Sequence, residues 1–177
     1  MKQNATLDSS FWINAHRSGL LPQVLERFRL HYAPEVAAEL SLDFASGREF
    51  WRLAGEGILT EAIPQADEVR GFGSGERAAM NLALEHRDWV LLIDDRRPLA
   101  EAQRMGLKTL CTPVLVVDLF EKGLWRLQDA VRQLARLTAM QTVSPALLQV
   151  ALAQLAVVRR RKEESHGHEE ADHLSEA

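Results

Sequence analysis

Carboxylate side chains follow two of the short apolar runs in this chain, at the points where the runs end. Asp8 closes the first run, and Asp94 and Asp95 follow the apolar residues 89–93. In an open parallel sheet, ligands bind beyond the carboxyl ends of the strands. Glu76 lies in the first turn of the helix expected to lead into the second of these strands. The sequence therefore predicts an acidic cluster at one edge of a sheet.

Each acid also has an ordinary structural interpretation. A glutamate in the first turn of a helix, such as Glu76, is stabilised by the helix dipole, and an aspartate after a strand is often a turn former. The convergence of several acids favours a functional cluster, because neighbouring carboxylates repel one another and raise one another's pKa unless a cation lies between them. Oxygen ligands select hard cations, so the expected ion is Mg²⁺ or Mn²⁺.

A divalent ion held by carboxylates suits hydrolysis of a phosphodiester. Such ions neutralise the phosphate, lower the pKa of a bound water and stabilise the leaving oxygen. No convincing alternative nucleophile is present. The single cysteine, Cys111, is interpreted as a small buried hydrophobe of a strand, and its solitary occurrence favours a reducing cytoplasm.

Short apolar runs alternate with longer helical patterns along the chain, which is typical of a parallel sheet with crossover helices. Strands are expected at residues 5–7, 30–33, 58–63, 89–93 and 108–111. Helices are expected at residues 11–18, 21–28, 35–42, 49–53, 76–86 and 98–105, and from residue 113 to about 158 the pattern is helical throughout, divided at Gly123 and at Ser144-Pro145. The fold class is therefore α/β.

The length of 177 residues indicates one domain, expected at residues 1–158. Residues 159–177, a basic run and a polar remainder, lack apolar periodicity. Residues 162–177 are expected to form a disordered tail, and the basic run at 159–162 is interpreted as a solvated helix end. No apolar stretch approaches the roughly 20 residues of a membrane span, and no signal peptide is recognisable, so a cytoplasmic protein without membrane contact is expected. The net charge of −4 gives no indication of nucleic-acid binding. The carboxylates of an acidic metal site make the net charge of the metal-free protein more negative, however, and bound cations would offset them.

The order of these motifs resembles a PIN domain, and most closely its VapC-like branch. The first half carries LDSS at residues 7–10, SGLL at 18–21 and APEVAAEL at 33–40. The second half carries GSGERAA at residues 73–79 and LLIDDR at 91–96, followed by Ala102 and the segment 105–107. The resemblance covers about residues 5–127, with looser agreement to residue 156.

This resemblance implies a PIN-like α/β/α sandwich with a central parallel sheet of four to five strands and extra C-terminal helices. It implies a metal-dependent endoribonuclease in which Asp8, Glu39, Glu76 and either Asp94 or Asp95 are the catalytic acids, with Asp94 slightly favoured. Asp8, Glu76, Asp94 and Asp95 would bind Mg²⁺ or Mn²⁺. Glu39 rests on the resemblance alone, since its spacing is that of an ordinary exposed helix residue. The resemblance further implies the toxin half of a toxin–antitoxin pair, with an antitoxin partner and a homodimer.

Two positions depart from the family pattern. The segment Cys111-Thr112-Pro113 stands where Gly-Thr and a small residue are usual, and Leu99 stands where Arg is frequent. Thr112 is retained and is expected to help hold a metal-bound water or a phosphate. The acids are intact, so these departures bear on the substrate-binding surface rather than on the cluster.

Several polar residues near the acids have two interpretations each. Ser9, Ser10 and Asn14 would support the ligating carboxylates through hydrogen bonds, while the alternatives are helix capping for the serines and a solvent-facing position for Asn14. The three arginines near the acidic pair would contact phosphates or merely balance its charge; they are Arg96, Arg97 and Arg104.

Two other classes of function remain open. One is a non-enzymatic protein of the same fold that binds nucleic acid or a protein partner, which the altered segment at Cys111 makes credible. The other is a phospho-acceptor receiver domain, which also has a parallel sheet and an acidic pair. Receivers place that pair after the first strand, whereas here it follows the fourth expected strand.

Overall fold

A five-stranded parallel sheet forms the centre of the computed structural model, which describes the backbone of residues 1–175 and the side chains of residues 1–164. The strands are β1 (Gln3–Leu7), β2 (Phe28–Tyr32), β3 (Leu59–Glu61), β4 (Val90–Leu92) and β5 (Lys108–Leu110). Their order is β3-β2-β1-β4-β5, and every neighbouring pair is parallel. The predicted α/β class with a parallel sheet of four to five strands is confirmed, with five strands.

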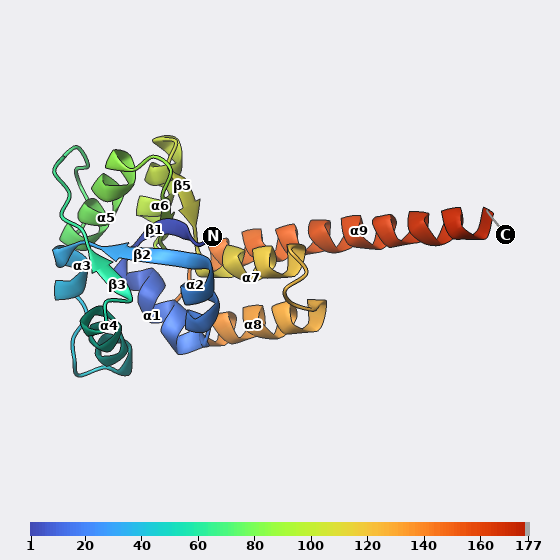
Figure 1. Cartoon of the computed structure of the whole chain (residues 1–177), viewed down its shortest axis with the longest axis horizontal. Coiled ribbons are helices and arrows are strands. Elements are labelled where there is room, and N and C mark those ends of the chain that lie inside the picture. Colours follow the sequence, from blue (N-terminus) through green and yellow to red (C-terminus); the bar gives the residue numbers. More distant parts are fainter. Residues whose placement is uncertain (176–177) are drawn as a thin grey trace.

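Helices cover both faces of the sheet, as Figure 1 shows. One face carries α1 (Ser9–Ser18), α2 (Leu21–Arg27) and α4 (Ala45–Gly55), while α5 (Ser74–Glu85) and α6 (Arg96–Arg104) lie on the other. The short helix α3 (Pro34–Ala38) packs against α5. Helices on two faces bury the inner strand β4 at every position, which explains why it is apolar throughout and not alternating.

The strand order places a topological switch point between β1 and β4. From β1 the chain moves outward to β2 and β3, then crosses back to β4 and moves outward again to β5. Ala5 pairs with Val90 and Leu7 with Leu92, so the two strands end side by side. The backbone N–H of Asp8 donates to the carbonyl of Leu92 at 2.9 Å. The two strands that are followed by acids, β1 and β4, are therefore neighbours. Their ends lie at the switch point, where α/β proteins bind ligands.

Several element boundaries differ from the sequence prediction. The helix expected at residues 35–42 ends at Ala38, and Glu39 is its C-terminal cap. The chain leaves the helix there because the indole N–H of Trp51 binds the carbonyl of Leu40 at 2.9 Å and anchors the following loop to α4. The helix expected at residues 21–28 ends at Arg27, since Phe28 begins β2.

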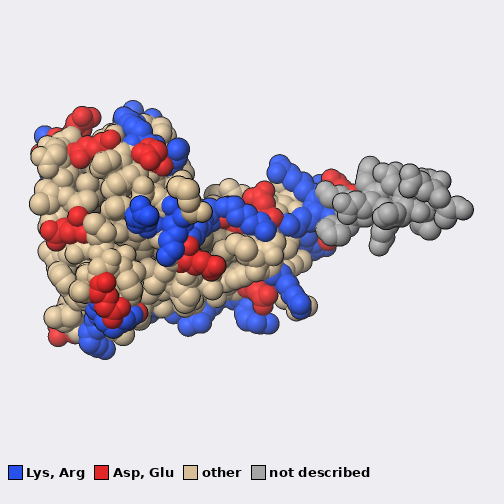
Figure 2. Space-filling view, in the orientation of Figure 1, with Lys and Arg blue, Asp and Glu red and all other residues tan. Residues whose placement is uncertain are grey.

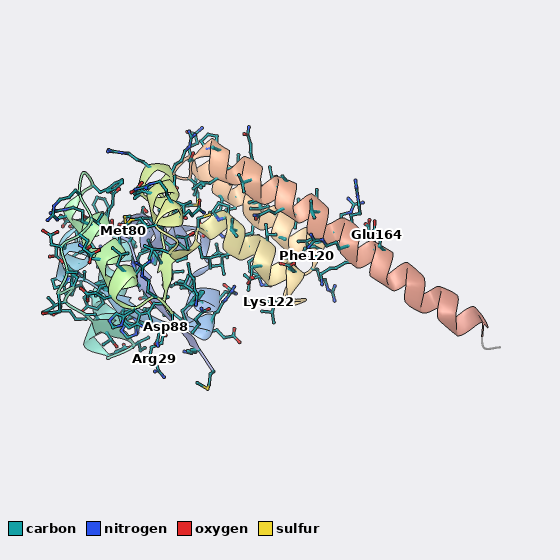
Figure 3. All side chains as sticks on the ribbon, turned by 90° about the horizontal axis from the view of Figure 1, so that it is seen from above. Arg29, Met80, Asp88, Phe120, Lys122 and Glu164 are labelled. Carbon is teal, nitrogen blue, oxygen red and sulfur yellow. The ribbon has the colours of Figure 1, made fainter. Side chains whose placement is uncertain are left out.

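Three helices follow the sheet and extend from it as an arm: α7 (Thr112–Glu121), α8 (Leu127–Met140) and α9 (Pro145–Ser175). In Figure 3, Phe120 and Lys122 lie at the far end of α7, beside α9. Lys162 of α9 lies over the Phe120 ring, with its ammonium 5.5 Å from the ring centroid.

The helix α9 continues through the basic run at residues 159–162 and its backbone is helical to Ser175, within the segment where a disordered tail was expected. Residues 176–177 of that expected tail lie outside the described part of the chain. Within the described part of the chain, no helix has the length and apolar character needed to cross a membrane.

Candidate functional site

Asp8 occupies the turn between β1 and α1 and is the N-cap residue of that helix. Its Oδ2 accepts hydrogen bonds from the backbone N–H of Ser10 at 2.9 Å and from the Ser10 hydroxyl at 2.5 Å. Its Oδ1 is buried and finds no hydrogen-bond donor among the described residues. Because almost all buried polar atoms in proteins are paired, this oxygen is an acceptor held ready for a ligand.

The electrostatic environment of Asp8 is unfavourable for its charged form. Burial raises the pKa of Asp8 to about 6, although the two hydrogen bonds from Ser10 oppose the shift, and the charges of Glu39 and Asp95 raise it further. These interactions show that three acids converge here. A cation bound at this site would lower the pKa of Asp8 again, because it favours the charged carboxylate.

Asp94 follows β4 and is almost fully buried, with three donors fixing its carboxylate. Oδ1 accepts from the backbone N–H of Thr112 at 2.7 Å, and Oδ2 accepts from the Thr112 hydroxyl and the Asn14 amide, each at 2.7 Å. Burial raises the pKa of Asp94 to about 6 against these bonds, and the neighbouring Asp95 adds to the shift. The solvent-facing alternative for Asn14 is therefore wrong, since this side chain is buried against Asp94.

Ser10 links the two buried acids. Its hydroxyl donates to Asp8 and accepts from the backbone N–H of Asp94 at 3.3 Å. Asp95 is exposed at the start of α6, beside Asp94. The cluster thus has two buried carboxylates with fixed orientation and one exposed carboxylate at their solvent side.

Glu39 reaches the same site from the end of α3. Its Oε2 accepts from the Ser9 hydroxyl at 2.5 Å, and its Oε1 accepts from the backbone N–H of Gly75 at 3.1 Å. The two serines therefore bind carboxylates with their hydroxyls, while Asp8 performs the capping that was the alternative for them. Glu39, which spacing alone did not single out, is held in place by two elements.

Glu76 is placed differently from the other acids. Its Oε2 accepts from the backbone N–H of Gly73 at 2.8 Å, which is the glutamate half of a capping box at the start of α5, since Gly73 has no side chain to supply the other half. Glu76 is not among the charges that shift the pKa of Asp8 or Asp94. This geometry matches the capping interpretation of Glu76, and its role as a catalytic acid stays a prediction.

The arginines near the acidic pair form no salt bridge with it among residues 1–164. Arg96 is exposed directly after the pair, and Arg97 lies over the ring of Phe72 at 5.0 Å. Arg104 pairs instead with Glu101 at 2.5 Å. The phosphate-contact and charge-balancing interpretations of Arg96 and Arg97 both stay predictions.

The donor set at this site fits a hard divalent cation. Asp8 offers its unpaired Oδ1, and Asp95 and Glu39 offer carboxylates that interact with it electrostatically. Oxygen donors of this kind bind Mg²⁺ and Mn²⁺. Among the described residues, however, no group of three or more His, Cys, Asp or Glu side chains is already arranged as a metal-binding cluster.

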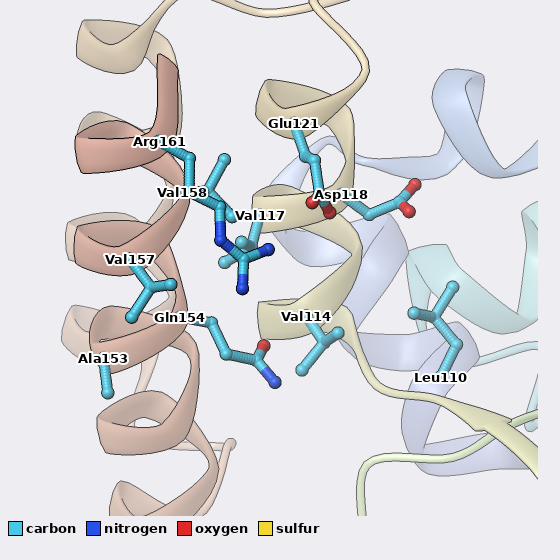
Figure 4. A pocket seen from close by; sticks show the side chains of 10 residues that line it. All are labelled: Leu110, Val114, Val117, Asp118, Glu121, Ala153, Gln154, Val157, Val158 and Arg161. Atoms are coloured by element: carbon cyan, nitrogen blue, oxygen red, sulfur yellow. The ribbon is translucent and has the colours of Figure 1, made fainter. Parts of the chain in front are cut away.

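A separate groove of about 440 Å³ lies between α7 and α9. Figure 4 shows valines of both helices lining it, with Asp118 and Glu121 on α7 and Arg161 on α9. It contains none of the predicted site residues. Over the face seen in Figure 2, basic and acidic side chains are mixed, so no field of a single sign covers it.

Sequence reasoning missed the role of Gly75. A Cβ at this position would lie 2.5 Å from Oε1 of Glu39, a distance that no packing tolerates, so only glycine permits the contact. The Gly-x-Gly-Glu spacing was the available signal. Cys111 is buried as predicted, but it follows β5 as the N-cap of α7 and does not lie in a strand; burial raises the pKa of its thiol to about 12.

Comparisons with known proteins agree with this architecture. The sequence matches the family DUF3368, described as a PIN domain, over residues 6–156. Among solved structures the chain is similar to the PIN domain endonuclease Utp24, with a TM-score of 0.48 and 13% identity over 62% of this chain and 84% of that chain. No curated protein matches it in sequence. Because the family match spans well over half of its length, the chain belongs to the PIN-domain family.

Proposed function

We propose that this chain is a metal-dependent endoribonuclease that hydrolyses RNA phosphodiester bonds with Mg²⁺ or Mn²⁺. The observation that carries the proposal is the unpaired Oδ1 of Asp8, buried at the switch point beside Asp94 and Asp95. Membership of the PIN-domain family supports a nuclease, since the fold is that of nucleases. The bound cation would supply charge neutralisation of the phosphate and a water of lowered pKa.

The side chains of the site divide into holding and positioning roles. Asp8, Asp94, Asp95 and, more remotely, Glu76 would hold the cation, and Glu39 completes the acidic set. Ser10, Asn14 and Thr112 fix the two buried carboxylates by hydrogen bonds, so that their oxygens need not reorient during the reaction. Ser9 does the same for Glu39. Thr112 acts through Asp94, because its hydroxyl is engaged there.

Arg96 supports the choice of a phosphate substrate. It is exposed at the first turn of α6, directly after the acidic pair, and has no salt-bridge partner among residues 1–164. A guanidinium beside a metal site can bind a phosphate oxygen of the substrate and orient the scissile bond. The biological setting we propose is the toxin half of a toxin–antitoxin pair in the cytoplasm, with an antitoxin partner and a homodimer, as in the VapC-like branch.

The decisive experiment is cleavage of a mixed RNA panel by the purified chain with Mg²⁺, with Mn²⁺ and with EDTA. Asp8→Asn and Asp94→Asn are compared with the wild type, and circular dichroism verifies their folding. We expect metal-dependent cleavage that both folded variants lose. Absence of cleavage by the folded wild type, together with absence of metal binding in calorimetry, would contradict the proposal.

A second candidate is a PIN-fold module that binds nucleic acid or protein without cleaving it. The capping role of Glu76 favours it, because one of the four expected acids is engaged in holding a helix end. The same panel separates the two functions, since metal-independent RNA binding without cleavage fits only the binding module.

A further inference from the structure

A cavity of about 730 Å³ lies between α1 and the start of α4. It is lined by Ile13, His16, Arg17, Phe44, Ala45 and Ser46. None of these residues belongs to the acidic cluster. Their chemistry, an aromatic ring and aliphatic carbons beside basic groups, differs from that of an ordinary surface depression.

The cavity and the candidate site lie along the same face of α1. Ser9, which binds Glu39, shares this face with Ile13 and His16, which follow it by four and seven residues. At 1.5 Å per residue these positions lie about 6 and about 10 Å from Ser9 along the helix axis. On the opposite wall, Phe44 follows Glu39 by five residues. An RNA strand that runs from the acidic cluster along α1 would therefore reach the cavity within the length of a dinucleotide.

The loop that carries Phe44 is fixed at both ends. The indole N–H of Trp12 donates to the carbonyl of Ser46 at 2.8 Å, and that of Trp51 donates to the carbonyl of Leu40 at 2.9 Å. Between these anchors, Arg48 donates to the carbonyls of Leu42 and Asp43 at 3.0 and 2.9 Å.

Phe44 itself remains 68% exposed on this anchored loop. An exposed aromatic ring forgoes the free energy that burial would provide. Because the backbone beneath it is anchored, less conformational entropy is lost when the ring binds a flat partner. The loop geometry is therefore that of a stacking platform.

Basic groups surround the ring on the α1 side. Arg17 is exposed, and Arg136 of α8 donates to its backbone carbonyl at 3.1 Å, which brings the second guanidinium to the same end of the helix. Neither arginine has a salt bridge among the described residues. Glu49, which interacts with His16, is itself bonded by Arg52 at 2.9 and 2.7 Å.

We propose that this cavity is a subsite for single-stranded RNA, in which one base of the substrate stacks on Phe44 and the adjacent phosphate binds Arg17 and His16. The inference rests on the proposed ribonuclease function and extends it to a residue that positions the strand beside the acids. Stacking on a ring does not depend on the identity of the base, so the subsite adds affinity without strict sequence preference. The positive charge of Arg17, which has no salt bridge among the described residues, favours a polyanion over an apolar peptide as the occupant.

The test measures RNA affinity of the full chain in EDTA, where cleavage is absent, by fluorescence anisotropy with 5′-fluorescein-labelled U12 and A12 oligoribonucleotides. Phe44→Ala removes the ring and Phe44→Trp retains a stacking surface. Leu124→Ala is the matched control, because Leu124 is a hydrophobic residue of the arm whose exposed fraction, 67%, is similar to that of Phe44. Arg17→Gln tests the phosphate contact, with Arg29→Gln as its control on β2.

We expect Phe44→Ala to weaken binding of both oligonucleotides about 5- to 150-fold, since stacking of one base contributes about 1–3 kcal/mol. Phe44→Trp and Leu124→Ala should bind like the wild type. Arg17→Gln should weaken binding and reduce the slope of log affinity against log salt by about one.

Equal affinities of Phe44→Ala and Leu124→Ala, with RNA bound by the wild type, would overturn the subsite and leave the nuclease standing; the cavity would then suit a protein partner. Binding that depends on Phe44 without any metal-dependent cleavage would support the subsite and contradict the nuclease. Failure of the wild type to bind either oligonucleotide would overturn the subsite, while cleavage with Mn²⁺ would still test the nuclease separately.

Discussion

The backbone N–H of Gly75 donates a hydrogen bond of 3.1 Å to Oε1 of Glu39, 36 residues earlier in the chain. A Cβ at position 75 would lie 2.5 Å from the same oxygen. A side chain at position 75 would therefore push the flexible Glu39 carboxylate out of this hydrogen bond. This contact, together with the hydroxyl of Ser9, holds Glu39 at the acidic cluster.

Substitution of Gly75 by alanine is expected to displace Glu39 from the site. The added methyl group forces the carboxylate away, so affinity for Mn²⁺ in calorimetry and the rate of RNA cleavage should each fall by about 10- to 100-fold, as for other contacts that orient a metal ligand. Gly55→Ala is the matched control, because Gly55 lies in a helix with no atom near its added Cβ. Unchanged affinity and rate in Gly75→Ala would show that Glu39 has no part in the site.

Replacement of Asn14 by leucine is expected to destabilise the metal-free protein in a pH-dependent way. The change removes a donor from the buried carboxylate of Asp94, which should lower the free energy of unfolding by about 1–3 kcal/mol at pH 8. At pH 5 the loss should be smaller, because Asp94 has a pKa near 6 and is then largely protonated.

Urea denaturation at the two pH values, in EDTA, measures this difference. Thr138→Val serves as control, since the Thr138 hydroxyl binds the carbonyl of Leu134 away from any acid. An equal loss at pH 5 and pH 8 in Asn14→Leu would mean that the bond does not act on the charged form of Asp94.

The metal-free protein is expected to lose stability as the pH rises from about 4 to about 6. Asp8 has a folded pKa of about 6 against an ordinary value of 3.8, so the folded state binds its proton more tightly than the unfolded state does. Its contribution to stability is therefore fully present below pH 3.8 and is lost as the pH passes through 6. The loss is on the order of 2–3 kcal/mol.

Urea denaturation across pH 4 to 8 in EDTA tests this expectation, with Asp8→Asn as the comparison. The variant should show a flatter profile and higher stability than the wild type at pH 7, because it carries no buried charge. Addition of Mn²⁺ should stabilise the wild type more at pH 7 than at pH 5. Parallel pH profiles of wild type and Asp8→Asn would contradict the assignment of the shift to Asp8.

The sheet and the two strand-end acids were predictable from the sequence because they depend on local patterns. The apolar run before Asp94 and the acid after the first strand place both carboxylates at one edge of a parallel sheet, and the structure brings them side by side. Which strands are neighbours depends on the order β2-β1-β4, which no single segment encodes.

The contacts that complete the site were not predictable from local patterns. Glu39 lies on a regular helix pattern, and its place near Asp8 results from α3 ending at Ala38, where tertiary hydrogen bonds of the tryptophans redirect the chain. The burial of Asn14 against Asp94 likewise depends on packing across 80 residues. Glu39 was predicted as a site residue only through the family resemblance. Glu76 was assigned to the acids by the sequence motif, whereas in the structure it caps the start of α5.

The most direct test of the proposed function is single-turnover cleavage of a labelled RNA pool by the wild type, Asp8→Asn and Asp94→Asn across a Mn²⁺ titration, with Asp118→Asn as a control on α7. A metal-dependent nuclease should cleave the RNA at a rate that saturates with Mn²⁺ and vanishes in EDTA. The rate should fall by at least about 100-fold in both site variants and stay unchanged in the control. Cleavage that is equal in Asp8→Asn and the wild type, or that proceeds unchanged in EDTA, would contradict the proposed function.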